Sequence, residues 1–268
     1  MQDTNLDQDH RLALVTGATG AIGRAIALEI AQHPGYRVKL LCRNPHKAEK
    51  AVSEIIQRSG NQRVSHEIVD LASKKSIEAV AGRLQNPVHV LVNNAAITPR
   101  HRHETPEGIE LQFATNVLGY FWLTRALDEQ LRSGSPARVV NVASYWAGGM
   151  DLDDLEFKNR AYNNNAAYRQ SKQADRMLTV AFARRLSEHG VTVNACHPGD
   201  VNSSLSNNLG FGGHESPEEG ARTPAWLATD DIGLSETGKY FERMQIRHCQ
   251  FGEDSTGVEA LYHACLAY

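Results

Sequence analysis

Short apolar runs alternate with longer segments of helical periodicity along the whole chain. The apolar runs are rich in β-branched residues and continuous rather than alternating, which is typical of strands that are buried on both faces of a sheet. We predict strands at 12–16, 37–42, 64–69, 88–92, 138–143 and 192–196, with intervening helices that include 21–32 and 45–59. This order predicts an α/β fold in which helices cover both faces of a doubly wound parallel sheet, giving three layers.

Nothing in the chain marks a boundary between two domains, because it contains no internal repeat, low-complexity tract or linker. Its 268 residues are enough for one large α/β domain and too few for two. We therefore expect a flexible N-terminus at 1–10 and a single domain at 11–268. The segment 202–220 is rich in loop-forming residues, so we expect a substrate lid around 200–222.

Composition narrows the class of protein without identifying a function. The formal net charge of −3 gives no electrostatic reason to expect a nucleic-acid partner. No apolar run approaches the ~20 residues of a membrane span, and the polar N-terminal segment has no signal-peptide core. The four cysteines are scattered, so neither a disulfide framework nor a metal site is expected. We expect a cytoplasmic protein without a membrane anchor.

A glycine-rich turn, TGATGAIG at 16–23, follows the first predicted strand and begins the first predicted helix. Glycines allow the backbone to turn tightly and approach a pyrophosphate, while the helix N-terminus supplies free N–H groups. A strand–helix turn without a ligand is the alternative. The strand–turn–helix context favours nucleotide binding.

Tyr168 and Lys172 lie four residues apart in the segment 166–186, whose pattern predicts a helix. Residues at this spacing share a helix face, so the Lys172 ammonium can lie beside the Tyr168 hydroxyl. A free phenol titrates near pH ~10, and lowering its pKa by roughly 3 needs about 4 kcal/mol of differential stabilisation. A nearby fixed cation acts in this direction, which makes Tyr168 a candidate acid–base catalyst.

Further motifs accompany these two in a fixed order along the chain. They are TGATGAIG at 16–23, Asp70 with Leu71, NNAA at 93–96, Asn116, Ser144, Tyr168 with Lys172, and HPG at 197–199. Together they resemble the short-chain dehydrogenase/reductase family over nearly the whole chain. An insertion at 151–156, with TPEG at 105–108, PEEGA at 217–221 and GKYF at 238–241, resembles the retinol-dehydrogenase-like branch. The resemblance implies a Rossmann fold.

The resemblance also implies four catalytic residues. Ser144 would hold and polarise the substrate carbonyl, and Tyr168 would exchange its proton. Lys172 would lower the pKa of the tyrosine and bind the nicotinamide ribose, and Asn116 would hold a water that links the lysine to solvent. Two of the four have an ordinary alternative, since Ser144 can cap a turn and Asn116 can bridge a helix kink.

The cofactor implied by the resemblance is NADP(H). Cys42 occupies the position where NAD-binding relatives place a carboxylate, and Arg43 follows it, as in NADP-preferring members. A guanidinium suits the extra phosphate through bidentate hydrogen bonds, although a surface arginine is the alternative. The implied cofactor contacts are Gly17, Thr19, Gly20, Ala21, Ile22, Arg43, Asp70, Leu71, Asn94, Ala95, Tyr168, Lys172, Pro198, Gly199, Val201 and Ser203.

Several of these contacts have structural alternatives. Asp70 would meet the adenine amine, but it could equally cap the following helix. Asn94 could serve the sheet alone. We interpret His197 as a structural residue at a strand end, and the basic cluster at 100–103 as solvated. The glycine spacing of 17, 20 and 23 differs from the usual pattern of the family's single-domain branch and leaves the phosphate-loop contacts open.

The function implied is an NADPH-dependent carbonyl reductase or alcohol dehydrogenase acting on a small-to-medium lipophilic aldehyde, ketone or secondary alcohol. A redox sensor or scaffold that binds NADP(H) without turnover is the main alternative. The glycine spacing alone suggests a nucleotide-sugar epimerase, against which chain length and Arg43 argue. The expected partner is a small-molecule substrate, and both a monomer and a homodimer stay open.

Overall fold

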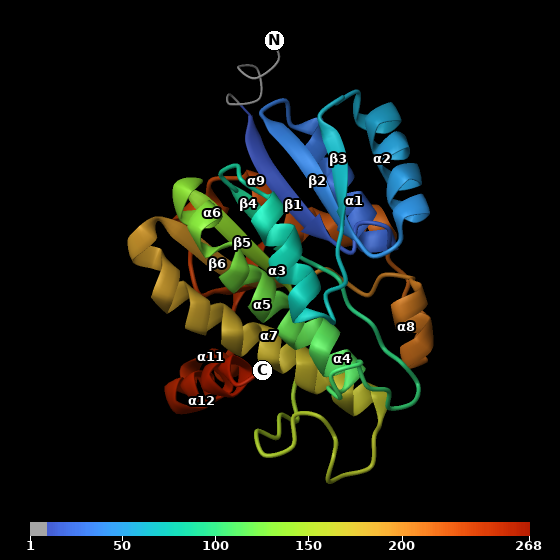
Figure 1. The fold of residues 1–268 in the computed structure, drawn as a ribbon, viewed down its shortest axis with the longest axis vertical. Coiled ribbons are helices and arrows are strands. Elements are labelled where there is room, and N and C mark those ends of the chain that lie inside the picture. Colours follow the sequence, from blue (N-terminus) through green and yellow to red (C-terminus); the bar gives the residue numbers. More distant parts are fainter. Residues whose placement is uncertain (1–9) are drawn as a thin grey trace.

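The computed structural model describes residues 10–268, so most of the expected flexible N-terminus lies outside the described residues. Within them one sheet runs through the molecule (Figure 1). Its strands are β1 (Arg11–Thr16), β2 (Tyr36–Cys42), β3 (Val64–Ile68), β4 (Val90–Asn93), β5 (Ala137–Val142), β6 (Val191–His197), β7 (Tyr240–Glu242) and β8 (Gln245–Arg247). Their spatial order is β3-β2-β1-β4-β5-β6-β7-β8, and only β8 runs antiparallel to its neighbour.

The order of the strands confirms the predicted doubly wound parallel sheet. From β1 the chain first proceeds outward through β2 and β3, then returns to β4 on the other side of β1. Such a reversal leaves a crevice beyond the carboxyl ends of the two central strands, where ligands of this fold bind. The six predicted strands are present, and β7 and β8 were missed because three residues each are too short for a periodicity signal.

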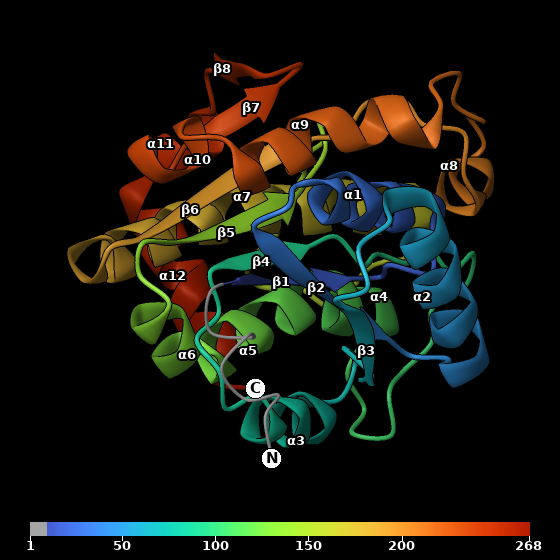
Figure 2. The same ribbon diagram turned by 90° about the horizontal axis from the view of Figure 1, so that it is seen from above.

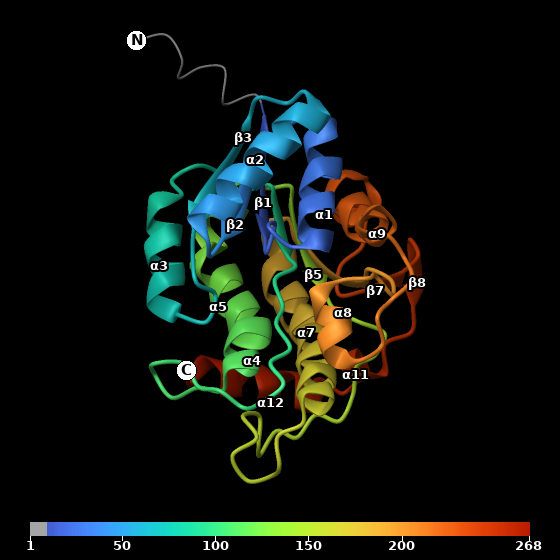
Figure 3. The same cartoon turned by 90° about the vertical axis from the view of Figure 1, so that its right-hand side faces the viewer.

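Helices cover both faces of the sheet (Figures 2 and 3). One face carries α1 (Ala21–Gln32), α2 (Pro45–Ser59) and α9 (Pro217–Thr229), and the other carries α3 (Lys74–Arg83), α5 (Gly119–Ala126) and α7 (Asn164–Leu186). The shorter elements are α4 (Leu111–Phe113), the π-helical η1 (Ala114–Leu118), α6 (Asp128–Ser133), the 3₁₀-helical η2 (Ser187–His189), α8 (Ser204–Leu209), α10 (Ile232–Ser235) and α11 (Gln250–Glu253). The last helix, α12 (Ser255–Leu266), packs against α7. Among residues 10–268, none of the helices combines the length and hydrophobicity needed to cross a bilayer.

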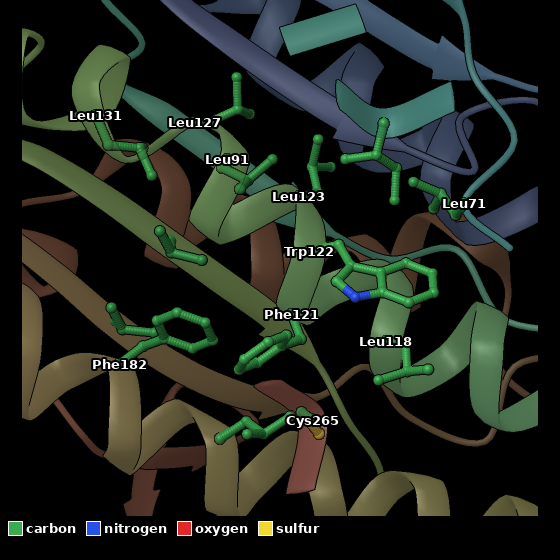
Figure 4. Packing of buried hydrophobic residues seen from close by; sticks show 14 of the residues in the cluster. Leu71, Leu91, Leu118, Phe121, Trp122, Leu123, Leu127, Leu131, Phe182 and Cys265 are labelled. Atoms are coloured by element: carbon green, nitrogen blue, oxygen red, sulfur yellow. The ribbon is translucent and has the colours of Figure 1, made fainter. Parts of the chain in front are cut away.

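The continuous apolar runs fill a separate core on each face of the sheet. In β1, Leu12 and Leu14 join the core under α5 and α7, whereas Ala13 and Val15 join the core under α1. Successive side chains of a strand point to opposite faces, so a strand between two helical layers needs apolar residues at every position. Figure 4 shows the first core, in which the fully buried Phe121 packs against Phe182 at a ring separation of 5.5 Å.

Local signals fix where the helices begin and end. The Asn44 side chain accepts a hydrogen bond from Lys47 N at the start of α2, and Gly60 ends that helix with φ of 75°. The 23-residue helix α7 is capped by Asn163, whose side chain accepts hydrogen bonds from the backbone of the first turn. This long helix crosses beneath β5 and β6 and provides a rigid support for the residues that its middle turns carry.

Candidate active site

A cavity of about 430 Å³ opens at the carboxyl ends of β1, β2 and β4, where the strand order reverses. It is lined by backbone and small side chains of the glycine turn, by cations at one end and by the loop after β6 at the other. The lining residues include Gly17, Thr19, Gly20, Ala21, Ile22, Arg43, Lys47, Asp70, Leu71, Asn94, Ala95, Thr115, Ser203 and Leu205. The predicted cofactor residues that precede α7 therefore gather around one space.

Close packing requires glycine at the first and last glycine positions of the turn, Gly17 and Gly23. Gly17 has φ of +64°, and a Cβ there would lie 2.8 Å from the Ala95 Cα. A Cβ on Gly23 would lie 2.4 Å from the Asn94 amide nitrogen and 2.5 Å from the Gly17 carbonyl oxygen. Gly20 precedes α1 as its N-cap without any side-chain cap, so the N–H groups of the first turn face the cavity without a side-chain competitor.

The segment after β4 is tied to this turn by its own backbone. Thr16 Oγ1 accepts hydrogen bonds from Asn94 N at 2.8 Å and Ala95 N at 3.0 Å. The Asn94 side-chain amide donates to the Thr16 carbonyl at 2.9 Å, so its nitrogen has a structural role. Asn93 is fully buried and donates to Asn141 Oδ1 at 2.9 Å, which gives it a structural role inside the sheet.

Two exposed cations border the far end of the cavity. Arg43 follows the last residue of β2, and Lys47 lies in the first turn of α2. Cys42, the last residue of β2, is buried, and burial raises the pKa of its thiol to about 11, so that it stays uncharged. The lining of this end therefore carries positive charge at the position where a carboxylate would select an unphosphorylated ribose. Lys47 was not predicted from the sequence.

Asp70 lines the same cavity from the loop after β3. Its Oδ1 accepts a hydrogen bond from Ala72 N at 3.0 Å, whereas the N-cap of α3 is Ser73, whose hydroxyl accepts from Ser76 N. The alternative in which Asp70 caps this helix is therefore wrong. Its contact with adenine remains a prediction.

A second, smaller cavity of about 70 Å³ lies next to the first, and Ile22, Asn94 and Ser203 line both. Ser144, immediately beyond β5, reaches it from the sheet, and Tyr168 and Lys172 reach it from α7. Ser144 and Tyr168 are 5% and 7% exposed, so only a small part of each faces the cavity. The remaining lining includes the predicted residues Pro198, Gly199 and Val201 from the loop after β6.

Lys172 is fixed by two acceptors. Its Nζ donates to the Val142 carbonyl at 2.8 Å and to Asp175 Oδ2 at 2.9 Å, and it lies 5.9 Å from the centre of the Tyr168 ring. Burial raises the pKa of Tyr168 above its ordinary value, while the Lys172 charge and a hydrogen bond with Ser144 oppose this rise. The lowering influence expected of Lys172 is therefore present, but burial of the phenol outweighs it.

Asn116 lies in the π-helical turn η1 and is fully buried. Its Oδ1 accepts from Ile97 N at 2.9 Å and its Nδ2 donates to Ile97 O at 3.0 Å, so it holds the backbone of the loop after β4 on both sides. The same Nδ2 lies 3.3 Å from Ser171 Oγ on α7. A π-bulge widens a helix and often marks a functional position. These bonds join η1 to the loop after β4 and to α7 and do not bridge the helix that carries Asn116, and the proton path through Asn116 remains a prediction.

Residues that the motifs did not indicate complete the surroundings of Ser144. Arg176 is buried, donates from Nη2 to the Ser144 carbonyl, and stacks on the Tyr240 ring at 3.5 Å. It lies four residues after Lys172, so helical spacing places both on one face, and this spacing was the available signal. Asp175 lies one residue earlier and was likewise missed.

Two aromatic rings lie at the edge of the smaller cavity, and of the two Phe211 lines it. The Trp146 ring lies 6.2 Å from the Tyr168 ring, and Phe211, which is 47% exposed, packs edge-on against Trp146 at 5.8 Å. Phe211 belongs to the expected lid segment 200–222, which contains α8, a backbone bridge between Val201 and Glu215, and the first turn of α9. The segment thus has more regular structure than a loop, and its movement as a lid stays a prediction.

Two other sequence interpretations can be compared with the structure. Burial lowers the pKa of His197 to about 4, and its ring packs edge-on against Tyr145 at 4.6 Å, in agreement with a neutral structural residue. In the basic cluster at 100–103, Arg102 pairs with Glu104 at 2.7 Å and donates from Nε to the Glu156 carbonyl at 3.0 Å. Arg102 is therefore engaged within its own loop and the 151–156 insertion.

A doubly wound sheet, a glycine-lined cavity at its switch point, and a serine, tyrosine and lysine beside that cavity define a nucleotide-dependent oxidoreductase class. The chain belongs to the short-chain dehydrogenase family, whose model, described as "short chain dehydrogenase", matches residues 11–211. It is 36% identical over 255 residues to human retinol dehydrogenase 13, covering 88% of this chain and 77% of that protein. The comparisons therefore confirm the predicted family and its retinol-dehydrogenase-like character.

Solved structures agree with the fold. An uncharacterized protein from Mycobacterium paratuberculosis superposes with a TM-score of 0.81 at 28% identity, covering 96% of this chain and 92% of that one. A variant of actinorhodin polyketide ketoreductase, solved with NADPH, superposes with a TM-score of 0.69 at 25% identity, covering 88% of this chain and 96% of that one.

Proposed function

We propose that this protein is an NADP(H)-dependent carbonyl reductase or alcohol dehydrogenase that acts on a small-to-medium lipophilic aldehyde, ketone or secondary alcohol. The observation that carries this proposal is the convergence of Ser144, Tyr168 and Lys172 on a cavity that lies next to the glycine-lined space and shares lining residues with it. Retinol dehydrogenases among the relatives and an NADPH-bound ketoreductase among the structural neighbours support the same chemistry.

The residues present fit a nicotinamide dinucleotide phosphate. The Cβ-free surface at Gly17 and Gly23 and the uncapped start of α1 suit a pyrophosphate. Arg43 and Lys47 suit an additional phosphate at the ribose end, because a guanidinium and an ammonium stabilise its charge by short hydrogen bonds. When bound, the cofactor supplies the hydride that converts a carbonyl into an alcohol.

The side chains of this chain would orient the substrate and exchange its proton. The Ser144 hydroxyl donates a hydrogen bond to the substrate oxygen, and the Tyr168 hydroxyl donates the proton that this oxygen gains on reduction. Lys172 stabilises the negative charge that the tyrosine then carries. Arg176 and the backbone N–H of Trp146, which donates to Ser144 Oγ at 3.1 Å, hold Ser144 in position from either side.

The wall of the smaller cavity favours an apolar substrate. Phe211, whose ring packs against Trp146, presents aromatic surface to this cavity, and Val201 and Leu205 line it as well. An apolar substituent beside these rings gains burial of about 25 cal/mol per Å². We therefore propose lipophilic carbonyl compounds or alcohols as the substrate class, and we keep a cytoplasmic location as part of the proposal.

Measurement of NADPH consumption over a panel of aldehydes and ketones tests the proposal. In Tyr168→Phe we expect kcat to fall by at least about 100-fold, because the proton donor is lost. The dissociation constant for NADPH should change little, since the ring and its packing against Trp146 are kept. Full activity in Tyr168→Phe would refute the role of the tyrosine.

A redox sensor that binds NADP(H) without turnover is the second candidate. It would bind NADPH with ordinary affinity and show no consumption with any member of the panel in either direction. The filled positions of all four predicted catalytic residues favour the enzyme.

A further inference from the structure

The ion pair between Lys172 and Asp175 is buried to an unusual degree. The two side chains are 2% and 0% exposed, and Nζ lies 2.9 Å from Oδ2. The second carboxylate oxygen, Oδ1, is buried without a hydrogen-bond partner among the described residues. Removing two charges from water costs several kcal/mol per ion, so such a pair is a weak source of stability. Stability therefore does not explain why this ion pair is buried, and its position beside Tyr168 suggests a role in catalysis.

We propose that Asp175 is a positioning residue whose carboxylate holds the Lys172 ammonium at the Val142 carbonyl and offsets its charge, keeping Tyr168 in the proton-donating form. The proposal rests on the proposed function for its catalytic consequence. The effect of Asp175 on the ionisation of Tyr168 can be measured in the protein without cofactor or substrate.

The hydrogen bonds of the ammonium explain how Asp175 holds Lys172 in position. An ammonium has three N–H donors, and two are used by the Val142 carbonyl and by Asp175 Oδ2. These two bonds leave one N–H, which suits a ribose hydroxyl of the cofactor. Asp175 lies three residues after Lys172 on the same helix, so the rigid α7 fixes the direction of this remaining donor.

The claim that Asp175 keeps Tyr168 protonated depends on which charges face Tyr168. The titratable groups around Tyr168 and Lys172 are Asp175 on α7, Tyr120 on α5, Cys196 on β6, and Tyr145 and Asp200 beyond β5 and β6. Burial raises the pKa of Tyr120 and of Cys196 far above neutrality, so both stay uncharged. Burial also raises the pKa of Asp175, to about 6, so it is a carboxylate at neutral pH.

Among the described residues, the charges that act on the phenol at neutral pH are the Lys172 ammonium and the carboxylates of Asp175 and Asp200, while the Arg176 guanidinium is bonded to the Ser144 carbonyl. The ammonium lowers the pKa of Tyr168, and both carboxylates raise it, Asp175 more than Asp200. Asp175 thus weakens the effect that a lysine at this position would otherwise have. A protonated phenol donates to a carbonyl, whereas a phenolate accepts from an alcohol, so Asp175 extends the pH range of the reductive direction.

The charge-removing variant Asp175→Asn tests this directly, because asparagine has nearly the same shape and retains one oxygen as an acceptor for Nζ. Near-ultraviolet absorbance of phenolate, taken as the difference from the same background carrying Tyr168→Phe, reports the titration of Tyr168 without cofactor or substrate. We expect the pKa of Tyr168 to fall by about 1 or more, since an uncompensated ammonium within about 6 Å favours the phenolate. The alkaline limb of kcat/KM for reduction should move to lower pH by a similar amount.

Asp200→Asn is the matched control, because Asp200 is a partly exposed carboxylate that also faces Tyr168. Water screens an exposed charge, so its removal should lower the pKa of Tyr168 less than Asp175→Asn does. Asp175→Ala replaces Asp175→Asn if circular dichroism shows that the asparagine variant is not folded. An unchanged or higher pKa of Tyr168 in the folded Asp175 variant overturns the proposal. Absence of turnover in the wild-type protein counts against the proposed function alone, because the titration needs no turnover.

Discussion

The two ends of the candidate site are built in different ways. At the glycine turn the cavity wall is made by backbone geometry, through the positive φ of Gly17, the close approach at Gly23 and the hydrogen bonds to Thr16. At the other end the wall is made by side chains from distant loops, with Phe211 reaching Trp146. Backbone geometry tolerates few residue types and leaves a recognisable motif, whereas a side-chain wall can vary and leaves none.

Gly23→Ala tests the backbone-built end of the site, and we expect it to have the largest effect of the variants considered. The added Cβ would lie 2.4 Å from an Asn94 amide nitrogen that is held by the Thr16 carbonyl, and 2.5 Å from a backbone oxygen. Neither neighbour can move freely, so we expect a loss of about 1–3 kcal/mol in the free energy of unfolding. We also expect NADPH affinity to fall by up to about 100-fold as the turn shifts. Thermal unfolding and fluorescence titration measure the two effects.

Gly82→Ala provides the control for Gly23→Ala. Gly82 is also a helical glycine, but a Cβ there meets nothing within 4 Å, so alanine should stabilise α3 by up to about 1 kcal/mol. NADPH affinity should stay at the wild-type value. Equal behaviour of the two variants would show that close packing at Gly23 does not shape the cofactor cavity.

A smaller and more selective effect is expected from Arg43→Asp. Arg43 is exposed at the edge of the larger cavity, so its replacement should leave the fold unchanged. Loss of charge-assisted hydrogen bonds to a ribose phosphate costs about 1.5–3 kcal/mol, which corresponds to roughly a 10- to 100-fold weaker binding of NADPH. NADH carries no such phosphate, so its binding should weaken far less. Equal losses for both cofactors, measured by fluorescence titration, would contradict the role of Arg43.

The sequence predicted the parts of the molecule that backbone geometry determines better than the parts that side chains from separate elements form. Continuous β-branched runs and the glycine turn predicted the sheet, the first helices and the cofactor cavity, because each reflects a local backbone requirement. The three-residue strands β7 and β8 were too short to be predicted. Asp175 was also missed, although it lies beside a predicted catalytic residue. Its importance depends on burial and on the Val142 carbonyl, which comes from a strand 30 positions before Lys172.

The net direction of the pKa of Tyr168 could not be obtained from the sequence for a related physical reason. Helical spacing shows that Lys172 can lie near Tyr168, but it shows neither how deeply the phenol is buried nor which other charges surround the ammonium. Burial is the largest influence on this pKa, and Asp175 reduces the opposing influence of the lysine. Side-chain environments assembled from separate elements are therefore where sequence reasoning needed the structure.

The smallest expected effect concerns the side-chain wall, through Phe211→Ala. Phe211 contacts Trp146 edge-on at 5.8 Å and contributes to the lining of the smaller cavity without taking part in hydrogen transfer. An aromatic contact of this kind contributes about 0.5–1.5 kcal/mol, so KM for a lipophilic carbonyl substrate should rise by roughly 2- to 10-fold. The turnover number should stay near the wild-type value, because the groups that exchange the proton are unchanged.

Ile246→Ala is the matched control for Phe211→Ala, since Ile246 is 49% exposed on β8, compared with 47% for Phe211. Its truncation removes similarly exposed apolar surface away from both cavities and should leave KM unchanged. Steady-state kinetics with one lipophilic and one small polar carbonyl compound make the comparison, and only the lipophilic substrate should respond to Phe211→Ala. A rise in KM for both substrates would instead indicate that Phe211 orders the 200–222 segment. The backbone of that segment, rather than a side-chain wall, would then shape the substrate end of the site.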